Sequence, residues 1–485
     1  MFFSVITSAL LIAFSVHPLG LSWVAFFGLV PILFSVNKNI HLRTIVQLGL
    51  IWGAVYASVS IFWLIFNIGT SISVAILTLI LAVIIISIGY GLIFFLYGFT
   101  IKKTSNFIGL FLLPFIWISI EYLRSYGAVA FPWLDLANTQ IENLYLIQNA
   151  EFVGSYGISF IVVVINIFLY NFLKELSVRS FVFIFLIISL PVLSGYFLYT
   201  QNDIKYIDSI DIGIVQPNIS LEKKTSSYIA ENFDNMLELS YNISNNIDLL
   251  VWPETAMLVN IFGGNWTIWK KQVEELVRRN QDMHLVSGIP YYKNGQPYNS
   301  AVEISFKDSL HHTFYHKIKL VPGAEYVPNF MSEYNLGGIN FFKGNDYKIF
   351  SLESLKYACM ICYESTFSLM SSRFIQEGAD FLVYIVNDGW YEVSPEPQQH
   401  AKQAILRAIE NRKFVVRSAN TGISMVVDPK GNIIKKLPLN YRGTIQAQIF
   451  KTEYISFYSK FGKVIYLLIA CITMFSLIII GFRKK

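Results

Sequence analysis

Long apolar runs, confined to the first 200 residues and the carboxyl end, are the feature of this sequence that most limits its fold. They lie at 2–16, 21–36, 45–66, 72–99, 107–123, 153–172, 180–199 and 464–482. Most approach the roughly 20 residues that a helix needs to cross the hydrocarbon core of a bilayer. The first run has no basic flank and no small-residue cleavage site, so we expect a helix there rather than a signal peptide. The sequence therefore predicts a membrane domain of about seven transmembrane helices over 1–200 and a further transmembrane helix at 464–482.

Charged residues are distributed unevenly and divide the chain into two parts. Residues 1–200 contain 12 charged side chains, whereas the remaining 285 residues contain 57. The chain as a whole is 14% charged, while soluble domains are usually about 25% charged. We therefore expect residues 205–460 to form a separate water-exposed domain, which is long enough to bury its own core. The net charge of +5 is spread out, which argues against nucleic acid as a partner, and three cysteines are too few for a disulfide framework.

Basic residues occur in every second loop between the apolar runs. They are Lys38 and Arg43, then Lys102 and Lys103, then Lys174 and Arg179, and finally the basic residues at 483–485. The loops at 17–20, 67–71 and 125–152 contain neither lysine nor arginine. By the positive-inside rule, both termini lie in the cytoplasm and residues 205–460 lie on the outer, periplasmic side. His17-Pro18 is interpreted as a tight re-entry between the first two runs.

One apolar run ends in charged residues, which are costly in a membrane unless they are paired or face water. Glu121 and Arg124 are three residues apart and share a helix face, so they can pair with each other. Alternatively they form a wall of a groove through which a lipid enters. The sequence leaves both possibilities open.

The outer domain alternates short apolar runs with amphipathic stretches. Expected strands are 211–216, 247–252, 284–289, 299–306, 357–362, 381–386, 413–417 and 422–427. Expected helices are 224–245, 266–279, 366–377 and 396–412. This alternation indicates an α/β layered domain.

Three separated stretches of this domain carry residues suited to nucleophilic catalysis. Cys362 follows the apolar run that begins at Tyr357 and precedes Tyr363-Glu364-Ser365, which indicates a thiol at a sharp strand-to-helix turn. A cysteine in such a place is often only a small buried hydrophobe. Glu254 ends the run that starts at Leu249, where a carboxylate can take the proton of a thiol or simply favour the start of a helix.

A cation for the oxyanion can come from the segment Tyr315–Pro328. Lys317 and Lys319 are two apart on an extended chain, so they face opposite sides and only one can point at the site. On helix 396–412, His400 offers a Cys–His dyad as a second possibility, although Glu254 and Lys317 already supply a base and a cation. Cys359 is expected to be a core residue, because positions three apart on a strand face opposite sides.

Glu254, Lys317 and Cys362, in that chain order, resemble the catalytic triad of the nitrilase, or carbon–nitrogen hydrolase, superfamily. The motifs Trp252-Pro-Glu-Thr255, Ile361-Cys-Tyr-Glu364, Asn387-Asp-Gly-Trp390 and Asn420-Thr-Gly422 resemble the bacterial apolipoprotein N-acyltransferase family. The resemblance implies a multi-pass α-helical membrane domain joined to an α/β nitrilase-like αββα sandwich domain. It selects Lys317 over Lys319 and implies that Glu325 pairs with Lys317. Tyr363, Glu364 and Trp390 are implied to support the site or to bind substrate.

The same resemblance implies an enzyme of lipoprotein biosynthesis in the bacterial cytoplasmic (inner) membrane. A phospholipid is the expected acyl donor and a diacylglyceryl apolipoprotein the acceptor, with a thioester on Cys362 between them. No metal and no cofactor are expected, and the chain is expected to be a monomer. The alternative is a membrane-tethered amidase or nitrilase-type hydrolase, in which water takes the acyl group; a protein that binds lipid without catalysis is a third possibility, against which the intact triad argues.

The alternation of basic loops predicts the outcome of a reporter fusion. A reporter fused after residue 205 should be exported, whereas one fused after residue 485 should remain in the cytoplasm, because an odd number of crossings precedes only the first point. Activity of a cytoplasm-dependent reporter at residue 205 would reverse the predicted orientation.

Overall fold

The computed structural model describes residues 1–16, 20–201, 204–243, 246–264, 266–279, 283–327, 340–391 and 394–482. The chain forms two compact units, which are Met1–Ile65, Ile72–Asn202 and Phe461–Lys485 in the first and Phe66–Ser71 and Asp203–Lys460 in the second. The short segment Phe66–Ser71 lies between two apolar runs in the sequence yet groups with the sheet-forming residues. His17-Pro18 and the basic residues at 483–485 lie outside the described residues.

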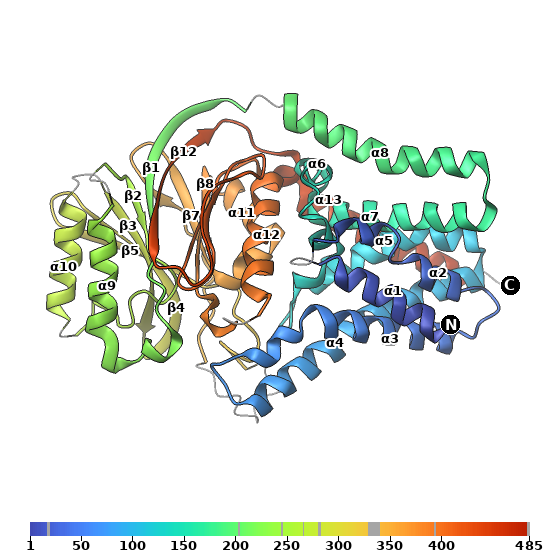
Figure 1. Ribbon diagram of the computed structural model, residues 1–485, viewed down its shortest axis with the longest axis horizontal. Coiled ribbons are helices and arrows are strands. Elements are labelled where there is room, and N and C mark those ends of the chain that lie inside the picture. The colour runs from blue at the N-terminus through green and yellow to red at the C-terminus, as the bar shows by residue number, and fades with distance from the viewer. Residues whose placement is uncertain are drawn as a thin grey trace. The chain divides into compact units, whose positions relative to one another are not determined.

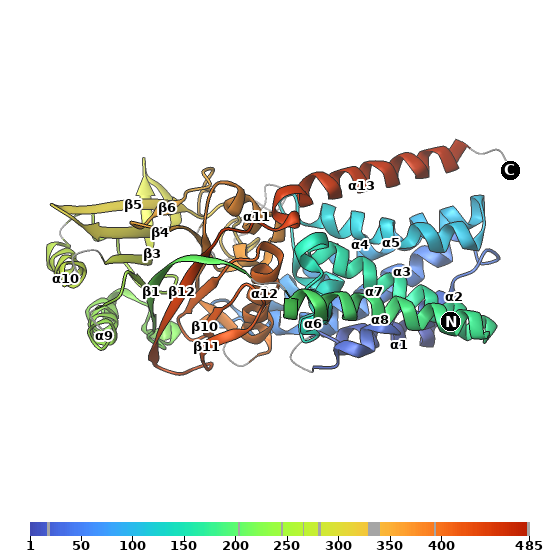
Figure 2. The ribbon, with the colours of Figure 1, turned by 90° about the horizontal axis from the view of Figure 1, so that it is seen from above.

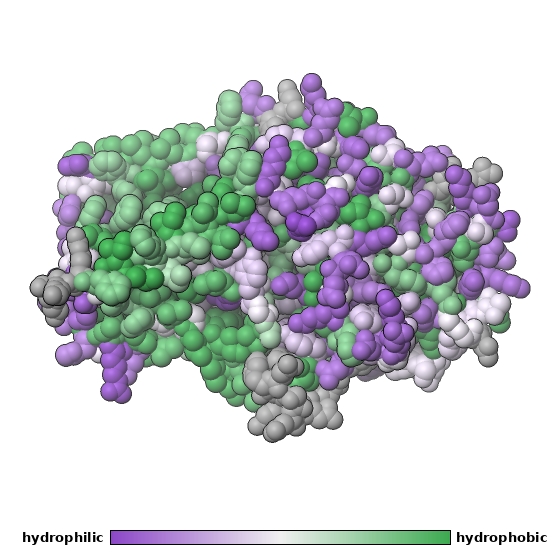
Figure 3. Space-filling model, turned by 180° about the vertical axis from the view of Figure 1, so that it is seen from behind, coloured by the Kyte–Doolittle hydropathy of each residue, from purple (hydrophilic) through white to green (hydrophobic). Residues whose placement is uncertain are grey.

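The first unit consists of helices (Figure 1). They are α1 (Phe2–Phe14), α2 (Val30–Ser35), α3 (Leu42–Ser60), α4 (Ile72–Lys103), α5 (Asn106–Arg124), α6 (Leu144–Ile147), α7 (Ala150–Glu175), α8 (Val178–Gln201) and most of α13 (Phe457–Phe482). Within the described ranges, six of them are long and apolar enough to cross a membrane, namely α3, α4, α5, α7, α8 and α13. Large apolar side chains on α8 and α13 are exposed, and Figure 3 shows such side chains gathered on the surface of this unit. A surface of this kind requires a lipid environment.

The first two apolar runs are shorter than a membrane span. Helix α1 has 13 residues, and the run at 21–36 forms a 3-10 helix (Ser22–Phe26) followed by the six-residue α2. Pro31 lies in the first turn of α2, where its missing N–H is tolerated. A Cβ on Gly28 would lie 2.6 Å from Cδ1 of Ile12, so a larger residue there would have to displace the Ile12 side chain on α1.

A buried polar cluster holds the segment after α5 inside the helical unit. The Arg124 guanidinium donates to Asp135 at 2.6 Å, rather than to Glu121. Glu121 instead accepts from the Trp117 indole at 3.0 Å and from the backbone N–H of Leu136 at 2.9 Å. Of the two possibilities that the sequence left open for Glu121 and Arg124, direct pairing is therefore wrong. Arg124 binds the Asp135 side chain and Glu121 binds the Leu136 backbone instead.

Among the described residues, the second unit contains two six-stranded sheets. The first has the order β12-β1-β2-β3-β4-β5 and the second β11-β10-β9-β8-β7-β6. The strands are β1 (Tyr206–Gln216), β2 (Leu249–Val251), β3 (His284–Lys293), β4 (Gln296–Phe306), β5 (Leu310–His316), β6 (Phe350–Ser351), β7 (Lys356–Ile361), β8 (Phe381–Val386), β9 (Val415–Ala419), β10 (Ser424–Val427), β11 (Ile433–Leu437) and β12 (Gly443–Thr452).

Helices cover the outer faces of the two sheets. Helices α9 (Ile229–Tyr241) and α10 (Thr267–Arg278) pack on the first sheet, and α11 (Ser368–Gln376) and α12 (Glu396–Asn411) lie on the second (Figure 2). The sheets contact each other through β1 with β9 and β4 with β7. The predicted fold class, helical membrane domain plus αββα sandwich, is confirmed. All eight predicted strands exist, whereas β5, β6, β11 and β12 were not predicted.

Strand direction brings the carboxyl ends of the central strands to common edges. Strands β1, β2 and β3 run parallel in the first sheet, and β7, β8 and β9 run parallel in the second. Loops at the carboxyl ends of parallel strands are the usual place for a site in such sheets. The loops after β2, β7 and β8 begin at such ends, and they contain Glu254, Cys362 and Asp388.

The Arg124–Asp135 pair predicts a large loss of stability when one partner is removed. Arg124→Leu leaves the Asp135 carboxylate buried without its cation, and breaking a buried pair in this way usually costs about 3–5 kcal/mol. Thermal unfolding in detergent should show this loss. Arg179→Leu, which changes an exposed arginine on α8, is the matched control and should change stability by less than about 0.5 kcal/mol. Equal melting temperatures for both variants would contradict a structural role for the pair.

Candidate active site

The turn after β7 holds Cys362 in a strained conformation. Cys362 has φ of +50°, in the left-handed region that non-glycine residues rarely occupy, and begins the 3-10 helix Cys362–Thr366. The Ser365 hydroxyl donates to the Cys362 carbonyl at 2.8 Å, and the Glu364 carboxylate accepts from the Ile361 N–H at 2.8 Å. The turn places the partly buried Cys362 side chain at the end of its strand, the position that a nucleophile at a sharp strand-to-helix turn occupies. The turn predicted from the sequence is present.

Glu364 joins this turn to the segment that carries Lys317. Its Oε1 atom accepts from the Tyr315 hydroxyl at 2.8 Å and from the N–H groups of Ile318 and Lys319 at 2.7 and 3.0 Å. Burial raises the pKa of Glu364 to about 6, while the hydrogen bonds from Ile361 and Lys319 oppose this rise. The side chain is fully buried, and its hydrogen bonds join the turn after β7 to the end of β5 and the residues that follow it.

Lys317 lies between two carboxylates. Its Nζ atom is 2.8 Å from Glu325 Oε1 and 3.4 Å from Glu254 Oε1, and the lysine side chain is 1% exposed. Burial by itself would lower the pKa of Lys317, but Glu325 and Glu254 together raise it well above its usual value. The lysine is therefore a permanent cation. The expected pairing of Lys317 with Glu325 is present in the structure.

The thiol of Cys362 lies within the field of the same groups. Burial and the Glu254 carboxylate raise the pKa of Cys362 well above its usual value, and Lys317 opposes them. The resting thiol is therefore protonated at neutral pH. A nucleophile in this state needs a base to take its proton during attack, and Glu254 is the carboxylate with the strongest electrostatic effect on it.

Asn299 belongs to this cluster but was not predicted. Its side-chain amide donates to Glu254 Oε1 at 2.8 Å and to Glu325 Oε1 at 2.7 Å, so it bridges the two carboxylates. Asn299 lies at the start of the predicted strand 299–306, now part of β4. A polar amide at the end of an otherwise apolar strand was the available signal.

Lys224 and Asn387 hold the turn that follows Glu254. Lys224 donates to the Thr255 hydroxyl at 2.8 Å and to the Thr255 carbonyl at 3.2 Å, while the Asn387 N–H donates to Glu254 Oε2 at 3.1 Å. Thr255 has φ of +51°, which is strained for a β-branched residue. A Cβ at Gly288 would lie 2.5 Å from the Thr255 nitrogen, so the neighbouring strand must carry glycine there. The Glu254 carboxylate is therefore held on both sides.

Trp390 and Tyr391 contact the short segment from the amino-terminal half of the chain. The Trp390 carbonyl accepts from the Ile68 N–H at 3.1 Å, and the Asn67 amide lies 3.2 Å from the Tyr391 hydroxyl. A Cβ on Gly69 would come within 2.2 Å of the Trp390 ring. The Trp390 side chain is 39% exposed. The Trp390 ring is thus in contact with Gly69 on one side and partly exposed on the other.

The structure also describes the other residues that the sequence analysis singled out, namely Tyr363, Lys319 and Cys359. Tyr363 is 5% exposed and packs edge-on against Phe367. The Lys319 ammonium lies over the Phe367 ring, 4.8 Å from its centroid. Cys359 is fully buried in β7, as expected, and both it and Cys362 are free thiols.

His400 lies near Cys362 but does not form the dyad considered from the sequence. Ligand atoms of Cys362, Asp388 and His400 fall within 4.8 Å of one another, a spacing that a metal ion could bridge. Both ring nitrogens are already engaged, however, Nδ1 with Asp388 at 2.8 Å and Nε2 with Ser365 at 2.9 Å. The arrangement of these donors favours a hydrogen-bonded network over a metal centre.

Comparison with known proteins covers both units. Residues 8–168 match the apolipoprotein N-acyltransferase N-terminal domain, and residues 211–456 match the carbon-nitrogen hydrolase domain. An apolipoprotein N-acyltransferase of Rickettsia typhi is 32% identical over 370 residues, covering 72% of each chain. One of Geobacter metallireducens is 25% identical and covers 95% of this chain and 91% of its own length. The chain belongs to the apolipoprotein N-acyltransferase family.

Solved structures similar to this chain come from the nitrilase superfamily. Nit3 of Saccharomyces cerevisiae has 18% sequence identity and a TM-score of 0.41, covering 50% of this chain and 91% of its own. The protein XC1258 of Xanthomonas campestris has 17% identity and a TM-score of 0.40, with the same two coverages. Membership of the apolipoprotein N-acyltransferase family confirms the resemblance found in the sequence and makes the chain an enzyme of a membrane-associated family.

The charge cluster predicts different effects for the two lysines of the Lys317 segment. Lys317→Met leaves Glu254 and Glu325 beside the thiol without their cation, so the pKa of Cys362 should rise further. A rise of one unit makes the thiolate about tenfold scarcer, and alkylation of Cys362 at pH 7 should slow by at least about that factor. The yield of the alkylated Cys362 peptide over time, measured by mass spectrometry, gives the rate.

Lys319→Met is the matched control, because this ammonium lies over Phe367 outside the carboxylate pair. Its alkylation rate should equal that of the parent enzyme. A slower rate for Lys319→Met than for Lys317→Met would mean that the wrong lysine has been placed beside the thiol.

Proposed function

We propose that this enzyme transfers an acyl chain from a phospholipid to the α-amine of the N-terminal diacylglyceryl-cysteine of lipoproteins. The carrying observation is the combination of the Glu254–Lys317–Cys362 cluster with family matches in both the membrane helices and the catalytic domain. Lipid substrates also account for a catalytic domain attached to several membrane-crossing helices.

In the first half-reaction Cys362 acts as the nucleophile. Its Sγ atom attacks the carbonyl carbon of a phospholipid ester while Glu254 takes the thiol proton. The Lys317 ammonium lies beside the site where negative charge develops on the carbonyl oxygen, and stabilisation of this kind is a major part of acyl-transfer catalysis. The ester C–O bond then breaks, the proton passes from Glu254 to the departing alcohol, and lysophospholipid leaves. A thioester remains on Cys362.

In the second half-reaction the amine of the lipoprotein attacks the thioester. A C–N bond forms, the C–S bond breaks, and the proton lost by the amine returns through Glu254 to the Cys362 sulfur. Glu325 and Asn299 support both steps, because they fix Lys317 and Glu254 at 2.8 Å from their partners. Glu364 keeps Lys317 and Cys362 in register, Tyr363 packs beside the nucleophile, and Trp390 offers its exposed ring to an acyl chain.

The predicted membrane arrangement completes this proposal. The domain boundaries are 1–200, 205–460 and 464–482, with the catalytic domain on the periplasmic side of the bacterial inner membrane and both termini in the cytoplasm. The basic residues of alternate loops support this orientation. The chain works as a monomer, without metal or cofactor, since Glu254, Lys317 and Cys362 supply the base, the cation and the nucleophile.

The two half-reactions can be separated by withholding the amine. Given phospholipid alone, the enzyme should release about one lysophospholipid per active site and then stop, because a thioester splits one barrier into two and waits for its acceptor. Mass spectrometry should find one acyl group on the Cys362 peptide, and hydroxylamine should remove it. A lipopeptide with a free N-terminal amine should discharge the enzyme, whereas its N-acetylated form should not.

Two variants serve as controls for loading. Cys362→Ser should carry no thioester, and Glu254→Gln should load far more slowly because the thiol has lost its base. Steady release of free fatty acid without any amine would contradict the transferase proposal and indicate a membrane-tethered hydrolase.

A further inference from the structure

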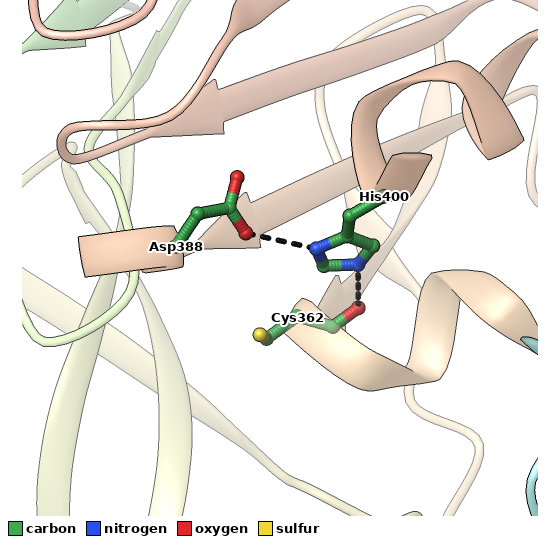
Figure 4. Close-up of side chains that lie close together, drawn as sticks. All are labelled: Cys362, Asp388 and His400. Atoms are coloured by element: carbon green, nitrogen blue, oxygen red, sulfur yellow. Dashed lines mark hydrogen bonds and ion pairs between the residues drawn. The ribbon is translucent and has the colours of Figure 1, made fainter. Parts of the chain in front are cut away.

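The carbonyl of Cys362, rather than its sulfur, faces His400. Figure 4 shows the carbonyl oxygen directed at the imidazole and the sulfur directed away from it. The ring comes from α12, and the turn that it meets follows β7. His400 therefore contacts the peptide that sets the conformation of the nucleophile.

Three polar atoms form a closed triangle at this point. Nε2 of His400 is 3.2 Å from the Cys362 carbonyl oxygen and 2.9 Å from Ser365 Oγ, and Ser365 Oγ is 2.8 Å from the same carbonyl. Every side of the triangle is a hydrogen-bond distance. Because Nδ1 donates its proton to the charged Asp388 carboxylate, the neutral ring offers Nε2 as an acceptor, and the Ser365 hydroxyl is the donor that lies between Nε2 and the Cys362 carbonyl.

The far side of the ring is fixed by a buried ion pair. Nδ1 lies 2.8 Å from Asp388 Oδ1, and the Arg417 guanidinium donates to Asp388 Oδ2 at 2.6 Å. Arg417 also donates to the Ile423 carbonyl at 3.1 Å. Burial would raise the pKa of Asp388, but Arg417 and His400 lower it, so the carboxylate stays charged. Because His400, Asp388 and Arg417 are each at most 2% exposed, the ring cannot turn without breaking these contacts.

These contacts leave His400 unsuited to be the base for Cys362. Both of its nitrogens are occupied by oxygen partners, and the sulfur points away from them. Burial and the nearby Arg417 also lower the pKa of His400. The histidine instead links the turn after β7 to the turn after β8, in which Asp388 lies.

We propose that His400 is a positioning residue, which Asp388 and Arg417 orient so that its Nε2 atom keeps the Ser365 hydroxyl beside the Cys362 carbonyl and so maintains the left-handed conformation of the nucleophile turn. The peptide unit is planar, so fixing its carbonyl also fixes the Cα atom of Cys362, from which the side chain with the sulfur extends. This proposal depends on the proposed acyl transfer only in naming the reaction for which Cys362 is positioned.

Two substitutions at His400 distinguish positioning from proton transfer. Gln offers an amide oxygen near the place of Nε2, which can accept from Ser365 but cannot act as a base, whereas Ala offers no acceptor. His400→Ala should slow loading of Cys362 from phospholipid by about 10²-fold, as expected for a reacting atom misplaced by about 1 Å. His400→Gln should retain at least about a tenth of the parent rate. Equal loss in both variants would overturn the positioning role in favour of a base.

The rates must be separated from simple loss of folded protein. Loading is therefore expressed per alkylatable Cys362 thiol, and the pH profile of alkylation is recorded beside it. His400→Ala should shift that profile, because the thiol moves relative to Glu254 and Lys317. An unchanged profile with an unchanged loading rate per thiol would reduce His400 to a purely structural residue and overturn the proposal.

His284→Gln is the matched control, since His284 in β3 also contacts a carboxylate, Glu303, but lies outside the nucleophile turn. Its loading rate and alkylation profile should be those of the parent. If the parent itself never loads from phospholipid, the proposed function fails, yet the alkylation profiles of His400→Ala and His400→Gln still decide whether the ring positions the thiol.

Discussion

One buried lysine between the carboxylates of Glu254 and Glu325 is the interaction on which the catalytic unit depends. Glu254 and Glu325 come from different loops, and Lys317 and Asn299 hold them together in an interior where an unpaired charge is very costly. The balance is incomplete by design, because two negative charges share one positive charge. Burial and the Glu254 carboxylate keep the pKa of the Cys362 thiol high, so in the proposed reaction the thiol stays protonated until Glu254 takes its proton.

The pairing of two sheets brings these charged residues together. Cys362 and Asp388 come from the second sheet, and Glu254, Asn299 and Lys317 from the first. Direct hydrogen bonds then tie the sheets at the site, from Asn387 to Glu254 and from the Lys317 segment to Glu364. Local strain at Cys362 and Thr255 is tolerated because several partners hold each turn.

The sequence predicted the class of the fold and the three residues of the cluster, because apolar periodicity and short motifs are local properties. The division of the second apolar run into a 3-10 helix and α2 is not visible in the sequence, since the contact of Gly28 with Ile12 depends on packing against α1. Strand β5, with its three histidines, lacks the usual strand composition and is set by pairing with β4. That pairing places Asn299 beside Lys317, which no local pattern reveals. The orientation of His400 likewise depends on Asp388, in the turn after β8, and on Arg417, in β9.

The segment Phe66–Ser71 makes the catalytic unit discontinuous along the chain. Its residues hydrogen-bond Trp390 and Tyr391, and Gly69 lies against the Trp390 ring. A protein truncated to the residues after 205 would therefore lack this segment. The Trp390 carbonyl would lose the Ile68 N–H, and the face of the indole ring that Gly69 covers would be exposed. Swapping catalytic domains between relatives meets the same obstacle, because the exchanged piece must bring a six-residue segment from a distant part of the gene with it.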